Sequence, residues 1–302
     1  MAWLQLKASI PPEQAEWLEE LLLAEGASAI TLQDAHDEPV FEPDRGTTPL
    51  WRETVLTGLY DDLAGVEAMI ERVQRAWAEQ SPDEPAPQIE YELLADRDWE
   101  REWMDGFEPL RMGERLWIVP SWHEAPDPDA VNLLLDPGLA FGTGTHPTTA
   151  LCLGWLDAQD LAQRQILDYG CGSGILAIAA LKLGAEIAVG VDIDPQALQA
   201  SRDNAERNRI DESSLVLDYP ERIGQGQFEV VVANILAGPL IEMAATIAAR
   251  VRPDGLLALS GILEAQTESV LEAYRAQGLI MDEPKEKEGW MLLTGRRPGQ
   301  QR

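Results

Sequence analysis

The sequence predicts two domains: a small α+β domain over residues 1–95 and a larger α/β domain over residues 107–302. Two observations support this division. Apolar segments in the first third follow the order strand, helix, strand, strand, helix, strand, whereas the later segments alternate strand and helix one by one. In addition, a chain of 302 residues is long enough to bury two hydrophobic cores.

Six segments of the first domain carry a clear periodicity. Alternating apolar residues predict strands, at 3–9, 27–32, 54–60 and 89–94. Helical spacing predicts one helix from Pro11 or Pro12 to Gly26, and a second over 66–77 with Asp61 or Asp62 at its N-cap. This βαββαβ order is the ferredoxin-like pattern. It contains no group of residues suited to catalysis, so we expect a recognition domain. A purely structural appendage is the alternative.

A linker helix is predicted over residues 96–106. The stretch D-R-D-W-E-R-E-W-M is strongly charged, and its two tryptophans, Trp99 and Trp103, are spaced to share one helical face. We expect these side chains to pack rather than to act chemically. Two strands are predicted next, at 107–122 and 131–135, and they lead into the second domain.

The second domain is organised around the sequence L-D-Y-G-C-G-S-G at Leu167–Gly174. An apolar strand precedes this G-x-G-x-G turn and an apolar helix follows it, which is the arrangement that lets backbone approach a nucleotide-like ligand. Asp192 comes 22 residues after Gly170, at the end of the next predicted strand, 187–191. A carboxylate at that position can accept hydrogen bonds from both hydroxyl groups of a ribose.

A second motif, D-P-G-L-A-F-G-T-G-T-H-P-T-T, spans Asp136–Thr149. Its density of glycine and threonine predicts a shaped loop over a site. Pro147 suits the first turn of a helix, preceded by His146 or Thr145, and Thr149 offers a hydroxyl to a ligand at that helix N-terminus. We expect His146 to organise the turn rather than to act as a base.

A third motif, N-I-L-A-G-P-L, begins at Asn234 and follows the apolar strand 227–233. Asn234 therefore lies at the carboxyl end of a strand, where open α/β sheets bind their ligands. The alternative is a turn asparagine that bonds only to nearby backbone. Further elements complete an alternating pattern: strands at 214–217, 256–259, near 279 and at 290–294, and helices at 195–208, 239–251 and 264–276.

The composition limits the choice of partner. The chain has 23 basic and 53 acidic residues and a formal net charge of −30, which disfavours binding to a nucleic acid backbone and suits a basic partner. Solubility or adaptation to high salt would explain the charge equally well. Two cysteines imply no disulfide framework, and no signal peptide or membrane span is visible. We expect a soluble, cytoplasmic protein, with a monomer as the default.

Taken in series, these motifs resemble the class I S-adenosylmethionine-dependent methyltransferases and, more closely, the ribosomal protein L11 methyltransferase family (PrmA). The resemblance covers essentially the whole chain. It implies a seven-stranded Rossmann-like methyltransferase domain, preceded by a ferredoxin-like domain that recognises the substrate. It also implies S-adenosylmethionine as the cofactor and methylation of the N-terminal α-amine and lysine side chains of ribosomal protein L11.

The resemblance also assigns residues. It implies that Thr149, Gly170, Asp192 and Asn234 contact the cofactor, and that the loop around Phe141 lies over the transferred methyl group. Asn234 would orient the cofactor and the incoming nitrogen. No general base is identified, and the three histidines of the chain form no metal-ligand cluster.

Other functions remain possible from the sequence. A nicotinamide dehydrogenase is disfavoured because Ile175 stands where a dinucleotide fingerprint has glycine. Methylation of a nucleic acid base is disfavoured because the motif at Asn234 lacks an aromatic residue to stack on it. A non-catalytic protein that retains the cofactor pocket remains open. So does a class I methyltransferase that acts on another protein or on a small-molecule amine.

Overall fold

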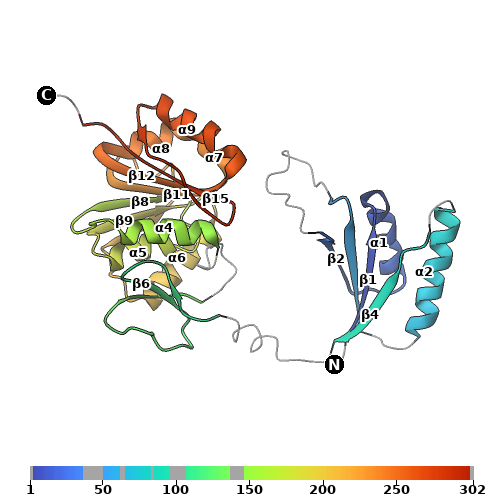
Figure 1. Cartoon of the computed structure of the whole chain (residues 1–302). Coiled ribbons are helices and arrows are strands. Elements are labelled where there is room, and N and C mark those ends of the chain that lie inside the picture. The colour runs from blue at the N-terminus through green and yellow to red at the C-terminus, as the bar shows by residue number, and fades with distance from the viewer. Residues whose placement is uncertain are drawn as a thin grey trace. The chain divides into compact units, whose positions relative to one another are not determined.

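A computed structural model of the chain describes residues 3–36, 50–61, 65–82, 85–94, 107–136 and 146–299. The chain divides into two compact units, Met1–Gly106 and Phe107–Arg302 (Figure 1). The predicted linker helix at 96–106 and the predicted position of Phe141 lie outside the described residues.

The described residues of the first unit form four strands and two α-helices. These are β1 (Trp3–Ile10), α1 (Ala15–Ala24), β2 (Ala29–Asp34), β3 (Thr54–Tyr60), α2 (Val66–Gln80) and β4 (Ile89–Leu94). The strands form an antiparallel sheet in the order β2-β3-β1-β4. The described elements therefore follow the predicted βαββαβ order. One detail is wrong: the N-cap of α2 is Gly65, at φ +80°, rather than Asp61 or Asp62.

The core of the first unit follows from the alternation along β1. Its even-numbered residues are buried, and they pack with the buried residues of the two helices: Leu4, Leu6, Ala8, Ile10, Leu18, Leu22, Met69, Val73 and Trp77. The first helix begins later than its prolines suggested, because Pro12–Gln14 forms a short 3₁₀ turn before α1.

The second unit is built on a large sheet in the order β10-β9-β8-β11-β12-β15-β13, with β14 paired to β15. The strands are β8 (Gln165–Tyr169), β9 (Ile187–Val191), β10 (Leu215–Asp218), β11 (Phe228–Asn234), β12 (Val251–Leu263), β13 (Ile280–Met281), β14 (Lys285–Lys287) and β15 (Trp290–Arg296). The five strands from β10 to β12 pair in parallel, and β15 is antiparallel to its neighbours. The chain order reverses between β8 and β11, so the ligand crevice is expected at their carboxyl ends.

Helices cover both faces of this sheet (Figure 1). They are α4 (Pro147–Asp157), α5 (Ile175–Lys182), α6 (Pro195–Arg207), α7 (Ala237–Glu242), α8 (Ala244–Arg250) and α9 (Thr267–Ala276). The segment predicted as one helix at 239–251 is thus two short helices.

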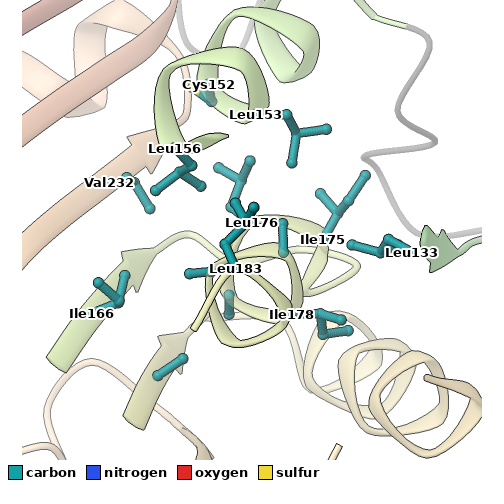
Figure 2. Packing of buried hydrophobic residues seen from close by; sticks show 14 of the residues in the cluster. Leu133, Cys152, Leu153, Leu156, Ile166, Ile175, Leu176, Ile178, Leu183 and Val232 are labelled. Carbon is teal, nitrogen blue, oxygen red and sulfur yellow. The ribbon is translucent and has the colours of Figure 1, made fainter. Parts of the chain in front are cut away.

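The two faces bury separate hydrophobic clusters, because successive strand residues point to opposite sides. Ile166 and Val232 belong to the cluster under α4 and α5, which Figure 2 shows. Their neighbours Leu167 and Val231 belong to the cluster under α7, α8 and α9. The first six residues of α5 are all buried, which explains why that helix is apolar on every side.

A small sheet, in the order β5-β6-β7, completes the second unit. Its strands are β5 (Leu110–Arg111), β6 (Leu116–Val119) and β7 (Val131–Leu134). The prediction of one strand over 107–122 is therefore wrong. The chain turns between β5 and β6, where Asp157 at the end of α4 accepts hydrogen bonds from the backbone N–H groups of Glu114 and Arg115.

Candidate functional site

The glycine-rich turn lies at the carboxyl end of β8. Gly170, Gly172 and Gly174 have φ angles of +82°, +54° and +76°, in the left-handed region that favours glycine. The space around two of these residues also requires glycine. A Cβ atom on Gly170 would lie 2.4 Å from Cγ2 of Ile235, and one on Gly174 would lie 2.8 Å from Oγ of Ser201. The turn is therefore packed directly against the residue that follows Asn234.

Asp192 lies at the end of β9, beside this turn. Its Oδ2 accepts a hydrogen bond from the N–H of Gly172 at 2.9 Å, and its Oδ1 accepts one from the N–H of Asp194 at 3.0 Å. Both bonds fix the orientation of the carboxylate. Each oxygen still has a second lone pair available for a ligand hydroxyl. The next residue, Ile193, is 83% exposed, so an apolar surface lies next to the carboxylate.

Thr149 and Asn234 come together from different elements. Thr149 lies in the first turn of α4 and is fully buried, whereas Asn234 ends β11 and is partly exposed. The Nδ2 of Asn234 donates a long hydrogen bond of 3.4 Å to Oγ1 of Thr149. Gly261 of β12 supports this corner, since a Cβ atom there would lie 2.3 Å from the carbonyl oxygen of Ile235.

His146 is the N-cap of α4. Its Nδ1 accepts a hydrogen bond from the N–H of Thr148 at 3.3 Å and lies 2.7 Å from the hydroxyl of the same residue. The imidazole also meets the indole of Trp290 edge to face, with ring centroids 4.8 Å apart. Burial lowers the pKa of His146. A neutral ring with an accepting Nδ1 suits a helix N-terminus, so His146 organises the turn, as its position in the sequence predicts.

Asp168 is a buried carboxyl group in β8, directly before the turn. Its Oδ2 accepts a hydrogen bond from the N–H of Ala177 at 3.1 Å, but its Oδ1 has no hydrogen-bond partner among the described residues. Burial raises the pKa of Asp168 to about 7. Burial, together with the charge of Asp168, also raises the pKa of the thiols of Cys152 and Cys171, so neither serves as a thiolate nucleophile near neutral pH.

These features fit a nucleoside that carries a further hydrogen-bond donor. A carboxylate with free lone pairs suits ribose hydroxyls, and an exposed isoleucine beside it suits the face of a base. The buried oxygen of Asp168 calls for a hydrogen-bond donor. Within the described ranges, no cluster of three or more His, Cys, Asp or Glu residues could hold a metal ion. The same ranges contain no helix long and apolar enough to cross a membrane.

The structure thus gathers all four predicted site residues at the carboxyl ends of β8, β9 and β11. Thr149 contacts Asn234, Asp192 contacts the glycine turn, and Gly170 packs against the turn that Asn234 begins. Sequence reasoning did not find the roles of Gly261 and Trp290. Each acts on a residue far away in the chain, and no local pattern marks such a pairing.

A doubly wound sheet of this strand order, with an antiparallel β15 and with a glycine turn and an acidic residue on neighbouring strands, is the fold of a class I methyltransferase. The family model described as Ribosomal protein L11 methyltransferase (PrmA) matches residues 2–298. The chain therefore belongs to this family.

Individual relatives carry the same family description. The chain is 69% identical over 298 residues to a ribosomal protein L11 methyltransferase of Chromohalobacter salexigens, covering 99% of this chain and 100% of that protein. It is 58% identical over 297 residues to one of Pseudomonas paraeruginosa, covering 98% and 99%. A crystal structure of a ribosomal protein L11 methylase from Lactobacillus delbrueckii subsp. bulgaricus matches with a TM-score of 0.59 and 31% identity. That match covers 64% of this chain and 100% of the solved chain.

Proposed function

We propose that this protein transfers methyl groups from S-adenosylmethionine to the N-terminal α-amine and lysine side chains of ribosomal protein L11. The observation that carries the proposal is the family match over residues 2–298. The site supports it, because its glycine turn, Asp192 carboxylate and buried Asp168 suit a nucleoside that carries a further hydrogen-bond donor.

Four residues would hold the methyl donor. Asp192 accepts hydrogen bonds from the ribose hydroxyls, using the lone pairs that the backbone leaves free. Gly170 adopts the positive φ that lets the turn present its backbone to the ligand while packing against Ile235. Thr149 and Asn234 contribute a hydroxyl and an amide from the adjacent corner. When bound, S-adenosylmethionine supplies an electrophilic methyl group on a sulfonium.

The protein must also receive its acceptor amine without a proton. At pH 7 the neutral form costs about 4–5 kcal/mol for a lysine of pKa about 10.4, but only about 1 kcal/mol for an α-amine. Desolvation in the site and loss of the proton to water can supply the neutral amine. We assign no general base: the accepting nitrogen of His146 is occupied by Thr148, and Asp168 is buried. Asn234 orients the cofactor and the incoming nitrogen through its amide.

Residues 1–95 would recognise the protein substrate, and residues 107–302 would carry the reaction. Charge supports this division, because residues 1–95 contain 20 acidic and only 5 basic residues. A surface of this kind attracts a lysine-rich protein and repels nucleic acid. In this proposal the protein works as a monomer in the cytoplasm, and its two cysteines are unpaired and buried.

The test is methylation in vitro with intact-mass and peptide mass spectrometry. The purified protein, S-adenosylmethionine and L11 should yield L11 methylated at its N-terminal residue and at lysines. L11 with chemically acetylated amines is the matched control and should gain no methyl groups. Methylation of small amines or of other proteins, with L11 left unmodified, would contradict the proposal and favour the alternative substrate classes.

A further inference from the structure

A row of buried polar side chains on α6 lies beside the site without belonging to it. Ser201, Asn204 and Asn208 are spaced so that they lie on one face of the helix and its C-cap. All three are buried. Buried polar groups are retained where their hydrogen bonds are satisfied, and a satisfied network fixes a single geometry.

Two of these side chains bond to the glycine turn. The hydroxyl of Ser201 donates to the carbonyl oxygen of Gly172 at 2.8 Å. The amide of Asn204 donates to the carbonyl oxygen of Ser173 at 2.9 Å. Two consecutive peptide groups of the turn are therefore fixed in orientation by α6, the helix that begins shortly after Asp192.

The third side chain bonds to β7. Asn208 accepts from the N–H of Leu134 at 2.8 Å and donates to the carbonyl oxygen of the same residue at 2.7 Å. Both backbone groups of Leu134 are thus paired with one amide, as they would be with a neighbouring strand. Asn208 also donates to the backbone carbonyl oxygen of Asn204 at 2.9 Å, so its amide is tied to the helix at the residue whose side chain bonds to the turn.

Arg207 extends this network to the residue that begins the glycine- and threonine-rich motif. Its Nη1 donates to Oδ1 of Asn204 at 2.9 Å, and its Nε lies 3.6 Å from Oδ2 of Asp136. Asp136 in turn accepts a hydrogen bond from the N–H of Ser121 at 2.7 Å. The glycine turn and the end of β7 are therefore held by the same helix.

We propose that Ser201, Asn204 and Asn208 are positioning residues, which set the glycine turn against β7 and thereby pre-form the binding site for the methyl donor. The turn needs such support, since three glycines at positive φ lose more conformational freedom on ordering than other residues do. Ligand affinity rises when the ordering has already occurred in the free protein. The inference rests on the proposed function, because it concerns the binding of S-adenosylmethionine.

Calorimetric titration of the full-length protein with S-adenosylmethionine tests this inference. Ser201→Ala removes one hydroxyl, and Asn204→Asp keeps the shape but replaces the amide donor by a carboxylate oxygen that faces the carbonyl of Ser173. Each variant should raise the Kd by about threefold to tenfold, the loss of one hydrogen bond. The KM for L11 should stay within about twofold in both variants, because neither residue contacts the protein substrate in the proposal.

Asp203→Asn is the matched control. It lies on the same helix, but its side chain is exposed and, among the described residues, accepts a hydrogen bond from Gln199 alone. Its Kd should equal that of the unaltered protein. The inference is overturned if Ser201→Ala, with an unchanged Tm, binds the donor as tightly as the control does. It is also overturned if the KM for L11 rises with the Kd in the same proportion. If Asn204→Asp fails to fold, Ser201→Ala decides alone. No binding by the unaltered protein would contradict the proposed function itself.

Discussion

Replacing Asp192 by asparagine should weaken both the donor site and the fold. The carboxylate uses both of its oxygens, one for the N–H of Gly172 and the other for the N–H of Asp194. Asparagine has nearly the same shape but only one accepting oxygen. Its NH₂ group must therefore face one of the two backbone N–H groups, donor against donor.

The magnitudes follow from these contacts. A hydrogen bond to a charged acceptor contributes about 1.5–3 kcal/mol, and Asp192 is partly exposed, so water can replace part of the loss. We expect the free energy of unfolding to fall by about 1–3 kcal/mol. In this variant S-adenosylmethionine also loses a charged acceptor for its hydrogen bonds. A loss of about 2–3 kcal/mol corresponds to a Kd raised roughly 30-fold to 150-fold.

Urea unfolding measures the first effect and calorimetric titration with S-adenosylmethionine the second. Asp194→Asn is the control, because the carboxylate of Asp194 caps α6 by accepting from the N–H of Gln196, and asparagine caps a helix equally well. Its Kd should stay within about twofold of the unaltered value. Donor binding by Asp192→Asn within about threefold of the unaltered value would refute the role of this carboxylate.

Three further substitutions address the rest of the site. Gly170→Ala should lower the free energy of unfolding by about 2–4 kcal/mol in urea, because of its positive φ and the 2.4 Å approach to Ile235; no loss would contradict the packing. The pKa of His146 is lower in the folded protein, so the unfolded chain binds more protons and stability falls as pH drops below about 6.5. His146→Asn retains a capping acceptor and should show a weaker fall in Tm between about pH 7 and 5; an identical fall would refute this role. The pKa of Asp168 is raised to about 7 in the fold, so its contribution to stability is lost as pH rises from about 4 to 7. Asp168→Asn should therefore raise the Tm of the ligand-free protein more at about pH 8 than at about pH 5. Equal shifts in Tm would contradict the view that ionisation of buried Asp168 destabilises the fold.

Local signals predicted much of this fold. The strand Thr54–Tyr60 has the bounds that its alternating residues indicate, and so does Ile89–Leu94. The two strands that end at Tyr169 and Asn234 could be recognised because strands buried on both faces carry runs of apolar residues, here Ile166–Leu167 and Val230–Ala233. Three of the four predicted site residues, Gly170, Asp192 and Asn234, lie at the carboxyl ends of such strands, and Thr149 lies in the first turn of α4; their motifs and the family resemblance pointed to them.

Contacts between distant segments could not be predicted in the same way. The short strand β14 has the sequence Lys-Glu-Lys, is exposed and shows no apolar alternation. It is a strand because it pairs with β15. Asn208 bonds to Leu134, which lies 74 residues earlier in the chain. Gly261 is required only because the backbone of Ile235 comes close to it. Such constraints come from tertiary packing, and one sequence carries no trace of them.

A crystal structure of the protein with S-adenosylmethionine tests the central claim most directly. The account predicts the donor at the carboxyl ends of β8, β9 and β11, with its ribose oxygens within about 3 Å of the Asp192 carboxylate. It also predicts that the backbone at Gly170 and the side chains of Thr149 and Asn234 touch the ligand. A donor bound elsewhere on the molecule, or one with its ribose away from Asp192, would contradict it.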